Sequence, residues 1–120
     1  MRTLSIIIPV YNEEKLITQT ITKVISADTL GLKKEIIVVD DGSTDHTPSL
    51  VNTFIKKNNK KIRLITKKNE GKGSAILIGL KKSKGDIIII QDADLEYLPK
   101  YYSSLLTPII DNCQLLIGDN

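Results

Sequence analysis

The segment IIIIQDADLEY, residues 87–97, joins a strongly apolar run to three closely spaced acids. Four consecutive isoleucines are typical of a β-strand that is buried on both faces. Asp92, Asp94 and Glu96 follow these isoleucines directly. The segment therefore predicts a buried strand with clustered negative charge at its end, where a cation or a polar ligand has to balance it.

Four other short apolar runs, mostly β-branched, have the length and composition of strands. The five predicted strands cover residues 4–10, 35–39, 62–65, 86–90 and 115–117. Apolar residues at helical spacing lie between them, within residues 16–25, 50–55, 76–80 and 102–110. Pro108 is expected to kink or shorten the last of these helices. Strands that are apolar on both faces and alternate with helices predict an α/β fold, a Rossmann-like, mostly parallel sheet with helices on both faces.

Length and composition favour one soluble domain. The chain has 120 residues, 41% of them apolar and 26% charged, and no apolar run approaches the roughly 18 residues that cross a bilayer. The N-terminus lacks the features of a signal peptide, so a cytoplasmic location is expected. Cys113 is the only cysteine, which excludes a disulfide or a cysteine-ligated zinc site within one chain.

The net charge of +3 comes largely from paired lysines. The pairs are Lys33-Lys34, Lys56-Lys57, Lys60-Lys61, Lys67-Lys68 and Lys81-Lys82. They are spread along the chain without interleaved aromatic residues, which favours a solvated surface over a nucleic-acid groove. Peripheral attraction to an anionic membrane surface stays open.

Polar and charged residues follow each of the first four predicted strands. They are residues 9–13 (PVYNE), 40–45 (DDGSTD), 67–73 (KKNEGKG) and 91–94 (QDAD). The carboxyl ends of parallel strands share one edge of the sheet, where ligands bind. Asp92 and Asp94 point to the same side if the chain between them is extended, and carboxylates together with phosphates are typical ligands of Mg²⁺ or Mn²⁺. A metal that holds a phosphorylated ligand is therefore predicted, with solvated turn residues or a helix cap as the alternative.

The glycine-rich segment is not a known phosphate loop. Lys72 is followed by Gly73 instead of Ser or Thr, which fails the P-loop pattern, and position 76 is Ile76 where a GxGxxG motif needs glycine. Gly71 and Gly73 still allow close backbone approach at the start of a helix, where Lys72 can meet an anion.

Four motifs together resemble a known family. IIIPVYNEE (6–14), IIVVDDGSTDHT (36–47), KNEGKGSAILIGL (68–80) and QDADLEY (91–97) resemble the nucleotide-sugar-binding half of family 2 glycosyltransferases with the GT-A fold, and most closely the polyprenyl-phosphate (dolichol-phosphate) mannose or glucose synthases. The resemblance covers residues 1–120 as one donor-binding domain, truncated at its C-terminus.

The resemblance implies a transferase that moves a sugar from a nucleoside-diphosphate sugar to an acceptor, either a polyprenyl phosphate or a growing cell-surface glycan. It implies that Pro9, Tyr11 and Glu13 line the nucleotide pocket, that Asp41, alone or with Asp40, contacts the base or ribose, and that Lys72 and Gly73 lie near the nucleotide. It also implies that Asp92 and Asp94 form the catalytic DxD pair, with Asp94 nearest an Mg²⁺ or Mn²⁺ ion. Gln91 would lie beside this pair. The acceptor site and any catalytic base would belong to the half that is missing.

The sequence also departs from the family pattern. Leu98-Pro99 stands where Asp-Pro is frequent, and Gly118-Asp119-Asn120 where Gly-Ser-Arg is frequent. Two other interpretations stay open. One is a non-catalytic fragment that binds nucleotide or associates with a partner chain through an exposed sheet edge. The other, a receiver-type signalling domain, fits less well because its paired acids should follow the first strand.

Overall fold

The computed structural model describes residues 2–58, 61–94 and 98–119, the last nine of them by their backbone alone. In chain order the elements are β1 (Thr3–Val10), α1 (Ile17–Ser26), β2 (Lys33–Asp40), α2 (Thr47–Asn58), β3 (Ile62–Thr66), α3 (Lys72–Lys82), β4 (Ile87–Ile90), the short 3-10 helix η1 (Pro99–Tyr101) and α4 (Tyr102–Asp119). Glu96 and Lys60 lie outside the described residues. The first four predicted strands are confirmed.

The sheet is parallel, with the strand order β3-β2-β1-β4. Ile7 at the centre of β1 pairs with Ile37 of β2 on one side and with Ile90 of β4 on the other. The chain moves outward from β1 through β2 to β3 and then crosses to the other side of β1 to form β4. The strand order therefore reverses between β1 and β4, which is the position where open α/β sheets bind ligands.

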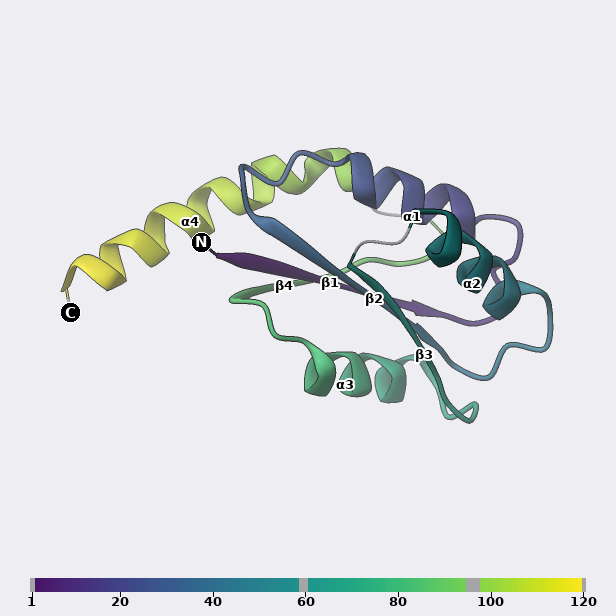
Figure 1. Ribbon diagram of the computed structural model, residues 1–120. Helices are drawn as coiled ribbons and strands as arrows, with labels where there is room; N and C mark the ends of the chain where they lie inside the picture. The colour runs from purple at the N-terminus through teal and green to yellow at the C-terminus, as the bar shows by residue number, and fades with distance from the viewer. Residues whose placement is uncertain (1, 59–60, 95–97, 120) are drawn as a thin grey trace.

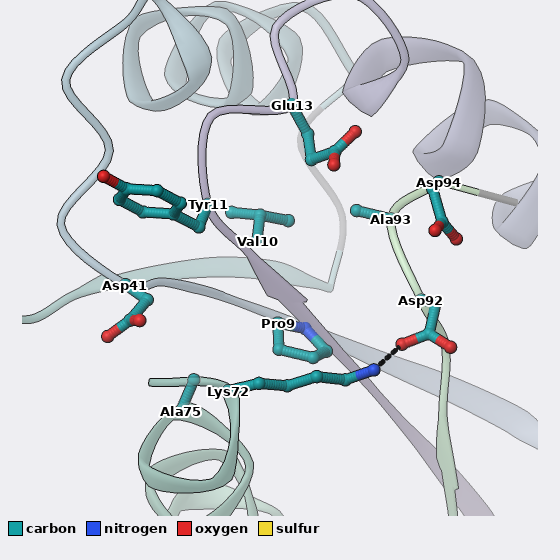
Figure 2. Close-up of a pocket in the computed structure, with 10 residues that line it drawn as sticks. All are labelled: Pro9, Val10, Tyr11, Glu13, Asp41, Lys72, Ala75, Asp92, Ala93 and Asp94. Atoms are coloured by element: carbon teal, nitrogen blue, oxygen red, sulfur yellow. Dashed lines mark hydrogen bonds and ion pairs between the residues drawn. The ribbon is translucent and has the colours of Figure 1, made fainter. Parts of the chain in front are cut away.

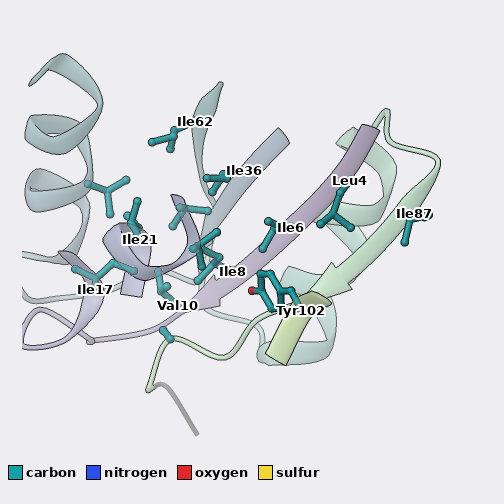
Figure 3. Packing of buried hydrophobic residues seen from close by; sticks show 14 of the residues in the cluster. Leu4, Ile6, Ile8, Val10, Ile17, Ile21, Ile36, Ile62, Ile87 and Tyr102 are labelled. Carbon is teal, nitrogen blue, oxygen red and sulfur yellow. The ribbon is translucent and has the colours of Figure 1, made fainter. Parts of the chain in front are cut away.

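Helices cover both faces of the sheet, as the apolar strands predict (Figure 1). The larger core lies between the sheet and helices α1, α2 and α4, and Figure 3 shows Ile6 and Ile8 of β1 in it together with Ile21 and Tyr102. Val51 of α2 belongs to the same core. The smaller core lies on the opposite face, between the sheet and α3. It contains Ile7, Ile37, Val39 and Ala75. Alternate residues of β1 thus enter different cores, as the period of two in a strand requires.

The prediction of a fifth strand at residues 115–117 is wrong. These residues belong to α4, which runs from Tyr102 to Asp119. An apolar run of three residues cannot distinguish strand from helix, and neither glycine nor proline occurs between residues 109 and 117 to end the helix. Of the two effects expected of Pro108, a kink or a shorter helix, the second does not occur, because the helix continues past Pro108 to Asp119. Proline inside a helix removes one hydrogen bond and crowds the carbonyl four residues earlier, yet this helix extends on both sides of Pro108.

The far half of α4 extends past the end of the sheet on the side of the N-terminus (Figure 1). Across the described part of the chain, no helix combines the length and hydropathy that a membrane span requires.

Candidate active site

A pocket of about 210 Å³ lies beyond the carboxyl ends of β1 and β4, beside the first turn of α3. Its lining residues are Pro9, Val10, Tyr11, Glu13, Asp41, Lys72, Ala75, Asp92, Ala93 and Asp94 (Figure 2). Seven of these are residues that the sequence singles out, so the structure gathers them in one place from four separate segments. The sequence also singles out Asp40, Gly73 and Gln91, but these residues do not line the pocket.

The loop after β1 is joined to the loop after β2 by the side chain of Asn12. The Asn12 Oδ1 atom accepts hydrogen bonds from the amides of Thr44, at 2.8 Å, and Asp45, at 3.3 Å. The backbone N–H of Asn12 donates a further hydrogen bond to Ser43 Oγ at 2.8 Å. Asn12 has a φ of 52°, a left-handed conformation that asparagine tolerates better than most residues. These bonds fix the loop that contains Tyr11, a residue that is 46% exposed and lines the pocket.

Glu13 faces the pocket from the same loop (Figure 2). Its amide donates to Thr47 Oγ1 at 2.9 Å, which attaches the loop to the start of α2. Burial raises the pKa of the Glu13 carboxyl above its ordinary value, and the negative charges of Asp94 and Asp45 raise it further. The pocket wall at Glu13 and Asp94 therefore has a negative potential that a cation would relieve.

The two acids after β2 have different surroundings. Asp40 is buried and its carboxylate accepts hydrogen bonds from the backbone amide and the hydroxyl of Ser43, so it closes its own turn and stays away from the pocket. Asp41 lines the pocket. Its Oδ1 atom accepts from Lys67 Nζ at 2.5 Å and from the Glu70 amide at 2.9 Å, and its Oδ2 atom accepts from the Gly71 amide at 2.9 Å.

These donors determine the charge state of Asp41. Burial alone would raise the pKa of its carboxyl, but the hydrogen bond from Lys67, the two backbone amides and the positive charge of Lys67 together hold that pKa below its ordinary value. Asp41 is thus an ionised carboxylate at neutral pH and acts only as an acceptor.

Lys72, the first residue of α3, reaches across Pro9 and forms an ion pair with Asp92 (Figure 2). Both side chains are partly exposed, so the pair contributes little to stability. Its importance is geometric, because it places an ammonium group and a carboxylate together inside the pocket. A phosphate group and a divalent cation could each replace one partner.

Buried hydrogen bonds hold the segment between Asp92 and Asp94. Thr20 of α1 donates from Oγ1 to the Ala93 carbonyl at 2.7 Å. Gln91 is fully buried; its Nε2 donates to the Asp92 carbonyl at 3.0 Å, and its Oε1 accepts from the Tyr102 hydroxyl at 2.6 Å. Gln91 therefore lies next to the acidic segment, to which its side chain is hydrogen-bonded, but it is buried and does not line the pocket.

The carboxylates fit a metal that is shared with a ligand. Around the described residues, no group of three or more His, Cys, Asp or Glu side chains is arranged to hold an ion. Asp92 and Asp94 nevertheless both line the pocket. Mg²⁺ typically takes one or two carboxylates and completes its shell with phosphates and water. The donor set therefore suits a divalent cation that arrives with a phosphorylated ligand.

Several site residues were not among those predicted. Val10, Ala75 and Ala93 line the pocket, but small and apolar residues carry no sequence signal for binding. Lys67 belongs to the polar segment expected after the third strand and also to the lysine pairs expected to be solvated, yet its side chain is only 6% exposed. Its position directly after β3 distinguishes it from the other paired lysines.

The sequence matches the family described as Glycosyl transferase family 2 over residues 5–119. An undecaprenyl-phosphate 4-deoxy-4-formamido-L-arabinose transferase from Edwardsiella ictaluri is 35% identical over 98 residues, which make up 80% of this chain and 30% of that protein. The chain thus spans less than a third of the length of this relative.

Solved structures show the same similarity. TarS from S. aureus (residues 1–349), in complex with UDP-GlcNAc, superposes with a TM-score of 0.76 at 29% identity, covering 92% of this chain and 31% of that one. The mannosyltransferase PcManGT from Pyrobaculum calidifontis, in complex with GDP-Man and Mn²⁺, superposes with a TM-score of 0.72 at 33% identity, covering 78% of this chain and 28% of that one. The family match decides against the receiver-type interpretation. Together with the parallel sheet and the pocket at its switch point, the match shows that this chain belongs to glycosyltransferase family 2.

Proposed function

We propose that the pocket binds the nucleoside diphosphate of a sugar donor, and that the chain forms the donor site of a metal-assisted glycosyltransferase. The observation that carries this proposal is the convergence of Lys72, Asp92 and Asp94 in one pocket at the switch point of the sheet. The similar structures of TarS and PcManGT hold UDP-GlcNAc and GDP-Man, respectively, which supports a nucleotide sugar as the ligand class.

Each charged residue has a distinct part in this proposal. Asp94, with Asp92, would hold a Mg²⁺ or Mn²⁺ ion against the diphosphate, and Lys72 would move from Asp92 to a phosphate oxygen. When bound, the ion supplies positive charge that stabilises the departing nucleoside diphosphate. In the transfer itself, an acceptor oxygen forms a bond to the anomeric carbon while the bond from that carbon to the phosphate oxygen breaks, and the electron pair leaves with the diphosphate.

Pro9, Tyr11, Glu13 and Asp41 would contact the nucleoside. They line the part of the pocket that comes from the end of β1 and from the loops after β1 and β2. Gly73 leaves open space beside the first turn of α3, because a Cβ built there would meet no atom within 4 Å. The backbone can therefore approach a ligand closely at this turn.

For the acceptor we propose a polyprenyl phosphate, with a growing glycan as the alternative. The support is the name of the Edwardsiella ictaluri relative, which is an undecaprenyl-phosphate sugar transferase. Such an acceptor would bring the protein to a membrane surface as a peripheral component. Since the chain spans 30% of that relative, we expect donor binding by these 120 residues to survive better than sugar transfer.

Calorimetric titration of the purified chain tests the donor site. UDP, GDP and their sugar conjugates are titrated with Mn²⁺ or Mg²⁺ present and again with a chelator. We expect binding that depends on the metal and that falls at least about tenfold, roughly 1.4 kcal/mol, in Asp94→Asn and in Asp92→Asn. Asp28→Asn is the matched control, because Asp28 carries the same charge in an exposed turn outside the pocket.

If the nucleotide affinity is unchanged by the chelator and by both pocket substitutions, the proposed role of the metal is contradicted. A folded sample that binds none of the nucleotides would contradict the donor site itself.

A further inference from the structure

The side chain of Lys67 is buried and contacts Asp41, one of the residues that line the pocket. Its side chain is 6% exposed and pairs with Asp41, whose side chain is 7% exposed. The Lys67 ammonium group also donates to the Lys68 carbonyl at 2.5 Å and lies 3.6 Å from Glu70 Oε1. Lysine is seldom buried to this degree unless its charge is paired, so the position of Lys67 calls for a specific partner, and Asp41 is that partner.

Asp41 joins Lys67 to the loop that follows β3. Besides the ammonium group, the Asp41 carboxylate binds the amides of Glu70 and Gly71, both at 2.9 Å. Gly71 caps the N-terminus of α3, and the next residue is Lys72. The hydrogen bond from the Gly71 amide to Asp41 is therefore only one residue away from Lys72, whose side chain lines the pocket.

Close backbone packing reinforces this connection. Gly42 has a φ of 76°, and a Cβ atom there would lie 2.8 Å from the Asn69 amide nitrogen. Residues 67–71 thus wrap tightly around Asp41 and Gly42, and the Lys67 amide donates to the Asp40 carbonyl at 3.0 Å. The loop has no regular secondary structure of its own, so these contacts determine its path.

We propose that Lys67 is a positioning residue of the donor pocket: by neutralising Asp41 it holds residues 67–71 in the conformation that directs Lys72 into the pocket. The inference rests on the proposed donor binding for its functional consequence, and on the Lys67–Asp41 geometry for its structural one. Lys67 itself does not line the pocket, so it acts through Asp41 and the loop and not by touching a ligand.

The test compares Lys67→Met with Lys68→Met. Methionine retains the unbranched side chain of Lys67 but removes the charge, and the neighbouring Lys68 is exposed, which makes it a matched control. The first measurement is hydrogen exchange of the Glu70 and Gly71 amides by NMR, with central sheet amides such as that of Val38 as the reference. The second is the dissociation constant for UDP or GDP with Mn²⁺, at a temperature where circular dichroism shows both variants folded.

We expect Lys67→Met to lose at least about tenfold protection at the Glu70 and Gly71 amides and at least about tenfold nucleotide affinity. Protection of the Val38 amide should match the wild-type protein, and Lys68→Met should match it in every respect. If Lys67→Met does not fold, Lys67→Gln replaces it, since glutamine still donates one N–H to Asp41 and should give an intermediate loss.

Unchanged protection at Glu70 and Gly71 would overturn the proposal, and so would an equal loss of protection at Val38, which would show a purely global destabilisation. If the wild-type chain binds no nucleotide, the proposed function fails, while the exchange of the two amides still decides whether Lys67 holds the loop.

Discussion

At the scale of single residues, the surroundings of the pocket carboxyl groups shift their pKa values in opposite directions. Asp41 receives three hydrogen bonds and a positive charge, which lower the pKa of its carboxyl. Glu13 is subject to burial and to the negative charges of Asp94 and Asp45, which raise the pKa of its carboxyl. The loop after β2 therefore provides a stable anion, whereas the negative charge of Asp94 disfavours ionisation of Glu13, which a bound cation would favour.

The raised pKa of Glu13 predicts how its replacement changes stability with pH. A carboxyl whose folded-state pKa exceeds its unfolded value stabilises the fold below the unfolded pKa, and that contribution is lost as the pH rises through the folded pKa. We expect Glu13→Gln to raise the melting temperature at pH 7 and to leave it nearly unchanged at about pH 4, where most of the wild-type Glu13 is protonated. Thermal unfolding of both proteins at the two pH values checks this.

Glu14→Gln is the control for Glu13→Gln, because Glu14 carries the same charge next to it and does not line the pocket. The same rise in melting temperature at both pH values would contradict the electrostatic explanation and indicate a packing effect. We further expect Glu13→Gln to weaken metal-dependent nucleotide binding, since it removes negative potential beside Asp94.

At the scale of elements, α3 covers the second face of the sheet by close contact with β1. Gly79 allows this approach, since a Cβ atom there would lie 2.5 Å from Ile7 Cγ2 and 3.2 Å from Ile7 Cδ1. Ile7 is fully buried between β2 and β4 and has little room to move. The short distance between α3 and β1 at Ile7 therefore requires that residue 79 has no side chain.

We expect Gly79→Ala to lower the free energy of unfolding by about 1 to 3 kcal/mol, although alanine favours helix more than glycine does. Gly73→Ala in the same helix is the control: its Cβ meets open space, so the substitution should be neutral or stabilise by up to about 1 kcal/mol. Urea unfolding of the two variants gives the comparison. Stabilisation by both substitutions would show that α3 can shift away from Ile7 without loss.

At the scale of the whole molecule, one edge of the sheet has an apolar surface. β4 pairs with β1, and no strand in the described part of the chain covers its other edge. Ile87 and Ile89 pack into the larger core, so Ile88 and Ile90 face the opposite side, where the two residues are 40% and 43% exposed. An uncovered edge with exposed isoleucines is a template for pairing with another strand.

We expect the purified chain to associate with itself as its concentration rises, through the edge of β4. Ile88→Lys places a charge on this edge and should weaken association at least about tenfold. Ile25→Lys is the control, because Ile25 is 39% exposed on α1, away from β4. Sedimentation velocity over a range of concentrations measures the effect. A monomer at every concentration would contradict this prediction, as would equal weakening by both substitutions.

Sequence patterns predicted the parts of this fold that depend on local chemistry. Runs of β-branched residues located four strands, and the acids after them located the pocket edge, because strand ends in a parallel sheet share one side. The pattern failed at residues 115–117, where the run was too short to distinguish strand from helix. It also failed at Lys67, because a lysine next to a lysine looks solvated unless the partner that buries it is known.

The sequence by itself determined the class of fold, the family, and seven residues that line the pocket, because apolar periodicity and short motifs are properties of neighbouring residues. Only the tertiary structure decided which acids face the pocket and which support it. Asp40 and Asp41 are adjacent in sequence, yet one closes a turn and the other binds a buried lysine 26 residues away. Burial and hydrogen bonding are set by residues distant along the chain, and these determine the charge and the role of each side chain.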